Sequence, residues 1–131
     1  MKLKEIDLFL KTKSQIKTMY KEISELSKKK PNDAVNIFKL NLINKILKDA
    51  NQLLKDNYKP FDGFEIFDED KLPSNSDVTI VLSQYLNAME ILRCDNIMES
   101  SHYYYWKVDG KISNIKTDDP LIREKRGSYV P

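Results

Sequence analysis

This chain of 131 residues is short of the residue types from which metal and catalytic sites are most often built. It contains one histidine, one cysteine and three glycines. The lone cysteine, Cys94, cannot form an internal disulfide, which fits a reducing cytoplasm. A structural zinc site needs about four nitrogen or sulfur ligands, so a single chain does not hold enough of them. The glycines are far apart, which excludes a glycine-rich phosphate loop of the GxxxxGK[ST] or GxGxxG type.

Long hydrophobic runs are also missing. No apolar run approaches the roughly 20 residues that a membrane span needs, and charged residues interrupt the first eleven positions, so the apolar core of a signal peptide is absent. With a formal charge of +2 and 40% hydrophobic residues, the composition is that of one folded domain. We therefore expect a cytoplasmic protein without a membrane association, while its oligomeric state stays open.

What the chain does contain is helical periodicity. Apolar residues recur at three- and four-residue steps from Phe9 to Leu26, which predicts a first helix that Pro31 ends. Asn32 or Asp33 is the expected cap of a second helix, whose apolar arc is wide enough to predict packing on two sides. Residues 57–75 have no period, and their aromatic residues predict a loop anchored by its own side chains.

A third helix is expected after Ser76 or Asp77, with a main apolar stripe from Val78 to Asn96 and a second stripe that includes Ile80, Cys94 and Met98. Asp109-Gly110 then sits between β-favouring residues and predicts a hairpin over 102–117. A two-residue loop would pair Trp106 with Ser113 and Tyr104 with Ile115, whereas a bulge would shift both pairs.

These elements predict an α+β fold that is mainly α. We expect an antiparallel three-helix bundle with the C-terminal hairpin packed on the second apolar face of the third helix, because an isolated hairpin is marginal in water. Residues 1–117 would form the single domain. Residues 118–131 would form a loosely ordered tail.

Candidate chemistry is sparse. His102 is the one histidine that could act as a base or a ligand, and an enzyme centred on His102 and the acidic loop is the third of three functional hypotheses. The acidic run Asp68, Glu69, Asp70 does not fit an EF-hand, because the oxygen ligands and glycine that this loop requires fall in neither register. We expect no catalytic set, no cofactor and no metal.

Charge is distributed unevenly along the chain. Residues 1–30 carry nine lysines and four acids, and residues 61–100 carry two basic residues and nine acids. Four lysines share one flank of the first helix, a spacing that could follow phosphates: Lys13, Lys17, Lys21 and Lys28. The alternative is an ordinary solvated helix face.

The aromatic block that ends in Trp106 carries the leading functional hypothesis. Tyrosine and tryptophan anchor protein partners, but they also cover helices and stack on nucleic-acid bases. We expect a non-enzymatic module, an accessory, regulatory or inhibitory subunit, that binds an unidentified protein. The candidate contact residues are Tyr103, Tyr105, Trp106 and Lys107, with Asp68, Glu69 and Asp70 as a second patch. Nucleic-acid binding through the first helix and the hairpin is the second hypothesis.

Overall fold

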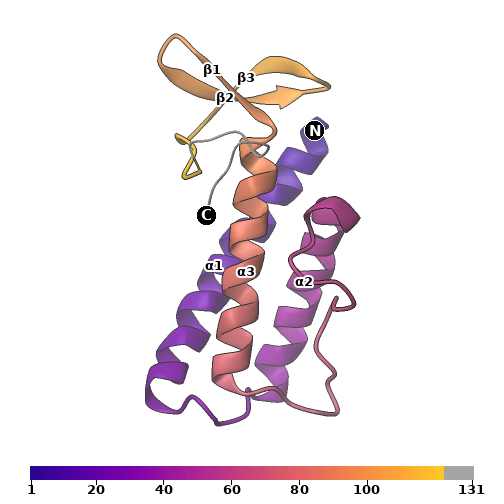
Figure 1. Cartoon of the computed structure of the whole chain (residues 1–131), viewed down its shortest axis with the longest axis vertical. Helices are drawn as coiled ribbons and strands as arrows, with labels where there is room; N and C mark the ends of the chain where they lie inside the picture. The colour runs from indigo at the N-terminus through magenta and orange to yellow at the C-terminus, as the bar shows by residue number, and fades with distance from the viewer. Residues whose placement is uncertain (123–131) are drawn as a thin grey trace.

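A computed structural model describes residues 1–122 as three long helices that lie side by side with a small sheet at one end (Figure 1). The helices are α1 (Leu3–Lys29), α2 (Ile37–Tyr58) and α3 (Asn75–Cys94). The strands β1 (Ile97–Ser100), β2 (Tyr103–Val108) and β3 (Lys111–Thr117) form one antiparallel sheet in that order. This is the mainly helical α+β class that the sequence predicts. Within residues 1–122, none of the helices combines the length and apolar character needed to cross a membrane.

The helices begin at caps other than those predicted. The side chain of Asn36 caps α2 by accepting a hydrogen bond from the Lys39 amide at 2.8 Å, and Ser74 caps α3 by accepting from the Asp77 amide at 3.2 Å. Asn32 and Asp33 instead lie in a connection that docks on the start of α3, where Ala34 pairs with Ser74 as an isolated β-bridge. The β-bridge between Ala34 and Ser74 therefore explains why both helices start at other residues than the sequence predicts.

The direction of α3 differs from the antiparallel prediction, because α2 and α3 run the same way. Their starting ends lie together, with the Asn75 amide at the start of α3 donating at 2.9 Å to the carbonyl of Asp33 in the connection that leads into α2. Their last turns also meet, where the Tyr58 hydroxyl donates to the Asp95 carboxylate at 2.6 Å. Figure 1 shows α1 descending from the sheet while α2 and α3 both rise towards it. Of the helices in residues 1–122, α1 is thus the one that runs antiparallel to its neighbours.

The loop of residues 59–74 makes this arrangement feasible. A 20-residue helix is about 30 Å long, and the loop can span about 50 Å when extended, so it returns the chain along the whole body. The rings of Phe61, Phe64 and Phe67 pack edge to face, with centroids 6.1 and 5.1 Å apart. Asn44 of α2 exchanges two hydrogen bonds, at 2.9 and 3.0 Å, with the backbone of Phe67. The predicted anchored loop is confirmed.

The core lies between the three helices and under the sheet. Its largest fully buried side chains come from all three helices and from β2: Ile6, Phe9, Ile16, Ile23, Leu40, Ile43, Leu47, Leu54, Leu82, Tyr85, Met89 and Trp106. The second apolar stripe predicted for the third helix is not covered along its length, since Ile80 remains 60% exposed. The sheet lies across the end of the helices instead (Figure 1).

Strand β1 occupies residues that were expected to continue the third helix. The helix stops at Cys94, and the Asn96 side chain donates to the Leu92 carbonyl at 2.8 Å, which satisfies a backbone group left open by the helix end. Ser101 and His102 then adopt φ of 51° and 73°, as in the tight primed turns that join antiparallel strands. Met98 therefore belongs to the sheet and not to α3.

The predicted hairpin at Asp109-Gly110 is present, with a shift in register. Val108 pairs with Lys111 as a two-residue loop requires, but Tyr104 pairs with Thr117 instead of Ile115. Between these pairs, the Ser113 hydroxyl donates to the Trp106 carbonyl at 2.6 Å and accepts from the Ile115 amide at 3.0 Å. The serine side chain bridges the bulge, which leaves β3 with extra residues opposite Trp106.

Candidate functional site

The outer face of the sheet brings together three of the four predicted aromatic and basic contact residues. Successive side chains of a strand alternate between its two faces, and Trp106 points into the core. Tyr103, Tyr105 and Lys107 therefore share the opposite face of β2. The strand register adds neighbours on the same face, because Met98 of β1 and Lys116 of β3 both pair with Tyr105. Ile112 pairs with Lys107 and completes the group.

This outer sheet face, defined as Met98, Tyr103, Tyr105, Lys107, Ile112 and Lys116, is apolar and positively charged. Tyr103 and Met98 are each 50% exposed, and Ile112 is 44% exposed. The ammonium group of Lys116 lies 3.5 Å from the centroid of the Tyr103 ring, a cation–π contact that holds both side chains. None of these six residues is acidic, so the face is suited to a partner with carboxylates.

Trp106, the fourth predicted contact residue, is buried and therefore not accessible to a partner. Its side chain is 1% exposed and packs edge to face against Phe9 of α1, with ring centroids 5.1 Å apart. The tryptophan fixes the sheet to the helices, because it is the largest side chain that the sheet contributes to the core. Replacing Trp106 would test folding and not partner binding.

The acidic patch is exposed and lies in the loop. Asp68 accepts from the Asp70 amide at 2.9 Å, which forms a local turn, and Glu69 receives a 3.4 Å contact from Asn44. These contacts explain the conformation of the loop without a ligand. Among residues 1–122, no group of three or more histidine, cysteine or acidic residues is placed to hold a metal ion.

The four lysines predicted to share a flank of the first helix have different surroundings. Lys13 turns towards the carboxylate of Glu90 at 3.9 Å, and burial lowers its pKa despite that neighbour. Lys28 pairs with Glu25 at 3.1 Å on the surface. Lys17 and Lys21 are exposed. The flank therefore presents two lysines to a phosphate backbone and not a row of four.

His102 occupies the exposed turn between β1 and β2. Its positive φ of 73° is the conformation of a turn residue, which gives the histidine a structural reason to be there.

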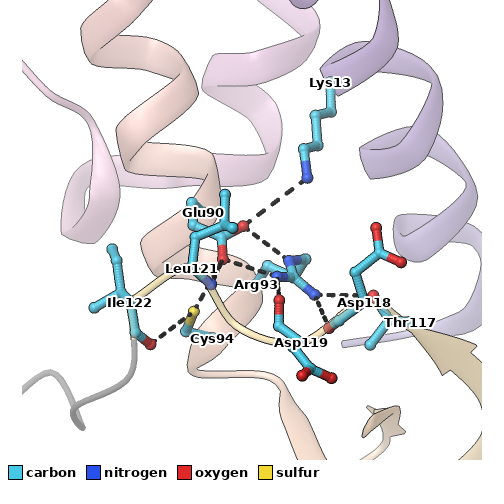
Figure 2. A network of polar contacts seen from close by, with 9 residues as sticks. All are labelled: Lys13, Glu90, Arg93, Cys94, Thr117, Asp118, Asp119, Leu121 and Ile122. Atoms are coloured by element: carbon cyan, nitrogen blue, oxygen red, sulfur yellow. Dashed lines mark hydrogen bonds and ion pairs between the residues drawn. The ribbon is translucent and has the colours of Figure 1, made fainter. Parts of the chain in front are cut away.

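The sequence did not reveal a buried polar cluster on α3 (Figure 2). Glu90 and Arg93 are 5% and 3% exposed. The Arg93 guanidinium donates to both carboxylate oxygens of Glu90, from Nε and Nη2, at 2.8 Å each. The Cys94 thiol also donates to Glu90, at 3.3 Å. The one signal in the sequence that could have identified the pair is a Glu and an Arg three residues apart, between the two apolar stripes of the third helix.

Burial and pairing act against each other in this buried polar cluster. Burial disfavours the carboxylate of Glu90, but hydrogen bonds from Arg93 and from the Leu121 amide outweigh it and hold the pKa of Glu90 below its ordinary value. Burial likewise opposes the charge of Arg93, while Glu90 keeps the pKa of Arg93 raised. Burial and the neighbouring Glu90 raise the pKa of the Cys94 thiol, which disfavours a reactive thiolate.

The buried polar cluster also fixes the first part of the predicted tail. Arg93 Nη1 donates to the Thr117 hydroxyl at 2.9 Å and to the Asp118 carbonyl at 2.8 Å. Arg93 Nη2 donates to the Asp119 carbonyl at 3.0 Å, and the Leu121 amide donates to Glu90 at 2.9 Å. Residues 118–122 are thus held against α3. The rest of the predicted loose tail lies outside the described residues.

In comparisons with known proteins, no protein-family model, curated protein or solved structure matches the chain.

Proposed function

We propose that the protein is a non-enzymatic interaction module that docks an acidic protein surface on its outer sheet face. It would serve as an accessory, regulatory or inhibitory subunit in the cytoplasm. The observation that carries the proposal is the grouping of two tyrosines, two lysines, a methionine and an isoleucine on one exposed face of the sheet.

The chemistry of this face supports a protein partner. Tyrosine contributes a large contact area with little loss of side-chain freedom, and residues of this type carry much of the binding energy in protein interfaces. Lys107 and Lys116 have no acidic neighbour among the six residues of the face, so the carboxylates of a partner would complement them and guide its approach. The sheet is braced from behind by Trp106, which keeps the face in place before binding.

A capture experiment tests the proposal. The tagged native chain is used to isolate binding proteins from its native lysate after nuclease treatment, beside the double variant Tyr103→Ala/Tyr105→Ala. Loss of the two tyrosines should weaken binding of the partner by about 2 kcal/mol or more, which is roughly a thirtyfold increase in Kd. The affinity of the identified partner for each variant is then measured by calorimetry.

The control is the loop variant Asp68→Asn/Asp70→Asn, which changes exposed charge far along the chain from the sheet. It should bind the same partner with unchanged affinity. Equal binding by the native chain and the tyrosine variant would disprove the proposed docking face, provided that the variant keeps the native circular dichroism spectrum. A partner lost only with the loop variant would move the interface to the acidic patch.

Single-stranded nucleic acid is the second candidate, because tyrosines flanked by lysines also stack on bases. Both candidates use the same tyrosines, so oligonucleotide binding and its salt dependence, and not the two variants, distinguish them. A nucleic-acid complex would lose affinity steeply with rising salt, in proportion to the phosphates contacted. A gel-shift series with labelled oligonucleotides at increasing salt would detect this, whereas the absence of any shift at low salt excludes it.

A further inference from the structure

We infer that Glu90 and Arg93 form a binding site for a bent peptide backbone, and that residues 118–122 occupy this site as a releasable latch. The inference is independent of the outer sheet face. It rests on the way in which the buried polar cluster holds the segment that follows β3 (Figure 2).

Every hydrogen bond that this cluster makes to residues 118–122 goes to their main chain. The guanidinium of Arg93 donates to two consecutive carbonyls, those of Asp118 and Asp119, at 2.8 and 3.0 Å. The carboxylate of Glu90 accepts from the Leu121 amide at 2.9 Å. The Cys94 thiol is 3.6 Å from the Ile122 carbonyl. Donors and acceptors therefore follow the backbone in sequence, as in a peptide-binding groove.

Three of the five side chains of the segment are exposed, whereas Pro120 and Ile122 are half-buried. Leu121 is 80% exposed, and Asp118 and Asp119 are exposed as well. Figure 2 shows their carboxylates pointing away from the guanidinium. The hydrogen bonds of this site therefore recognise the geometry of the backbone. A segment of another chain that bends in the same way can satisfy the same groups.

The site would also persist after the segment leaves. Glu90 and Arg93 stand three residues apart on α3 and hold each other through two hydrogen bonds of 2.8 Å. Both belong to the helix, whose neighbouring residues Met89 and Leu92 are buried in the core. Release of the latch therefore leaves charged donors and an acceptor already positioned for a new backbone.

The first experiment removes one hydrogen bond from the segment. Leu121→Pro deletes the amide hydrogen that Glu90 accepts, while the matched variant Leu121→Ala keeps that hydrogen and shortens an exposed side chain. Because Cys94 is the only cysteine and contacts the segment, its reaction rate with a thiol reagent reports opening. We expect Leu121→Pro to react about tenfold faster than the native chain, since a hydrogen bond to a charged group is lost. Leu121→Ala should react within about twofold of the native rate.

The second experiment supplies the segment in trans. A capped peptide of residues 117–122 is added at millimolar concentration to full-length Leu121→Pro, because an untethered peptide lacks the millimolar effective concentration of a linked one. The peptide should slow the reaction of Cys94 towards the native rate. The same peptide with an N-methyl group on its leucine, which cannot donate to Glu90, should not slow it.

Three results would overturn the inference. Equal reaction rates for Leu121→Pro and Leu121→Ala would show that this amide does not hold the segment. Failure of the unmodified peptide to protect Cys94 would show that the site does not accept a free backbone. Rapid hydrogen exchange of the Leu121 amide in the native chain would contradict the latch without requiring any variant to fold.

Discussion

Glu90 and Arg93 are charged side chains buried in the fold. Their burial costs desolvation free energy, so the contacts that offset this cost are important for stability. Moving an ion pair out of water carries a desolvation penalty that is recovered only when the geometry is good and the remaining polar atoms are satisfied. Here the two groups are joined by two hydrogen bonds, and the backbone of residues 118–121 takes up other donors and acceptors. The pair is thus tied to the segment after the sheet as well as to the helix.

Removing one charge should expose this dependence. Glu90→Gln would leave the Arg93 guanidinium buried without its counter-charge, so we expect the free energy of unfolding to fall by about 3 kcal/mol in urea denaturation. Glu25→Gln is the matched control, since Glu25 pairs with Lys28 on the surface. Its effect should stay below about 0.5 kcal/mol. Similar losses in the two variants would contradict a special role for the buried pair.

The same carboxylate predicts a pH dependence. The pKa of Glu90 is lowered in the folded state, so the unfolded chain takes up the proton at a higher pH than the folded chain. The stabilisation is complete above the ordinary glutamate pKa of about 4.3 and is lost as the pH falls through the lower folded value. Between about pH 7 and about pH 3, the native chain should lose more stability than Glu90→Gln. Parallel denaturation curves of the two proteins at each pH check this expectation.

Thr12 poses the opposite problem, a buried hydroxyl without a partner. Its side chain is fully buried on α1, and among residues 1–122 no group forms a hydrogen bond with its oxygen. Thr12→Val replaces the hydroxyl with a methyl group of similar shape, so we expect the free energy of unfolding to rise by about 1 kcal/mol. Thr18→Val is the control, because Thr18 is exposed and already donates to the Ser14 carbonyl. A destabilised Thr12→Val would imply that the hydroxyl has a partner after all.

At the scale of elements, the helix starts show where tertiary pairing overrides local signals. Asn32, Asp33 and Asn36 are all residues that can cap a helix. The bridge between Ala34 and Ser74 holds the chain extended until Asn36. Only Asn36 therefore has the geometry to accept from the first turn of α2.

Substitution of the two asparagines tests this choice. Asn36→Ala should lower the free energy of unfolding by about 1 kcal/mol, because the Lys39 amide loses its acceptor. Asn32→Ala, at an exposed position before the bridge, should be nearly neutral. Thermal denaturation followed by circular dichroism measures both. The reverse order of effects would return the cap to the predicted site.

The elements that the sequence predicted are those encoded by neighbouring residues. Periodic apolar residues gave the three helices, and Asp109-Gly110 gave the hairpin turn, since its positive φ values need only those two residues. The predicted docking of the loop was also correct, because its phenylalanines have to be buried somewhere. Strand β1 was missed because Met98 fits the helical stripe equally well, and only pairing with Tyr105 places it in the sheet.

Long-range contacts explain the remaining differences. Whether Trp106 faces the core or the solvent depends on Phe9, which lies far away in the sequence. The buried pair of Glu90 and Arg93 depends on backbone groups after β3. Periodicity of apolar residues contains no information on either contact. The sequence therefore indicated the candidate contact residues of the hairpin together, but not that Trp106 faces the core while the others face outwards.

For the molecule as a whole, the parallel course of α2 and α3 is the feature most open to direct test. In a Cys94→Ala background, the double variant Ala34→Cys/Ser74→Cys should form an internal disulfide, because residues paired across a β-bridge have the Cα spacing that a disulfide needs. Ala34→Cys/Asp95→Cys is the control, since it joins opposite ends of the body. Non-reducing mass spectrometry distinguishes the two, and cross-linking of the control alone would indicate antiparallel helices.

This parallel course also sets an order of events during folding. Helices α1 and α2 are joined by the short connection 30–36, so they can associate as soon as both exist. Helix α3 has to wait until residues 59–74 have carried the chain back to the starting end, and closing that longer excursion costs entropy before any contact repays it. The two N-terminal helices should therefore assemble first, and the sheet, which needs both Phe9 and the end of α3, should complete the molecule last.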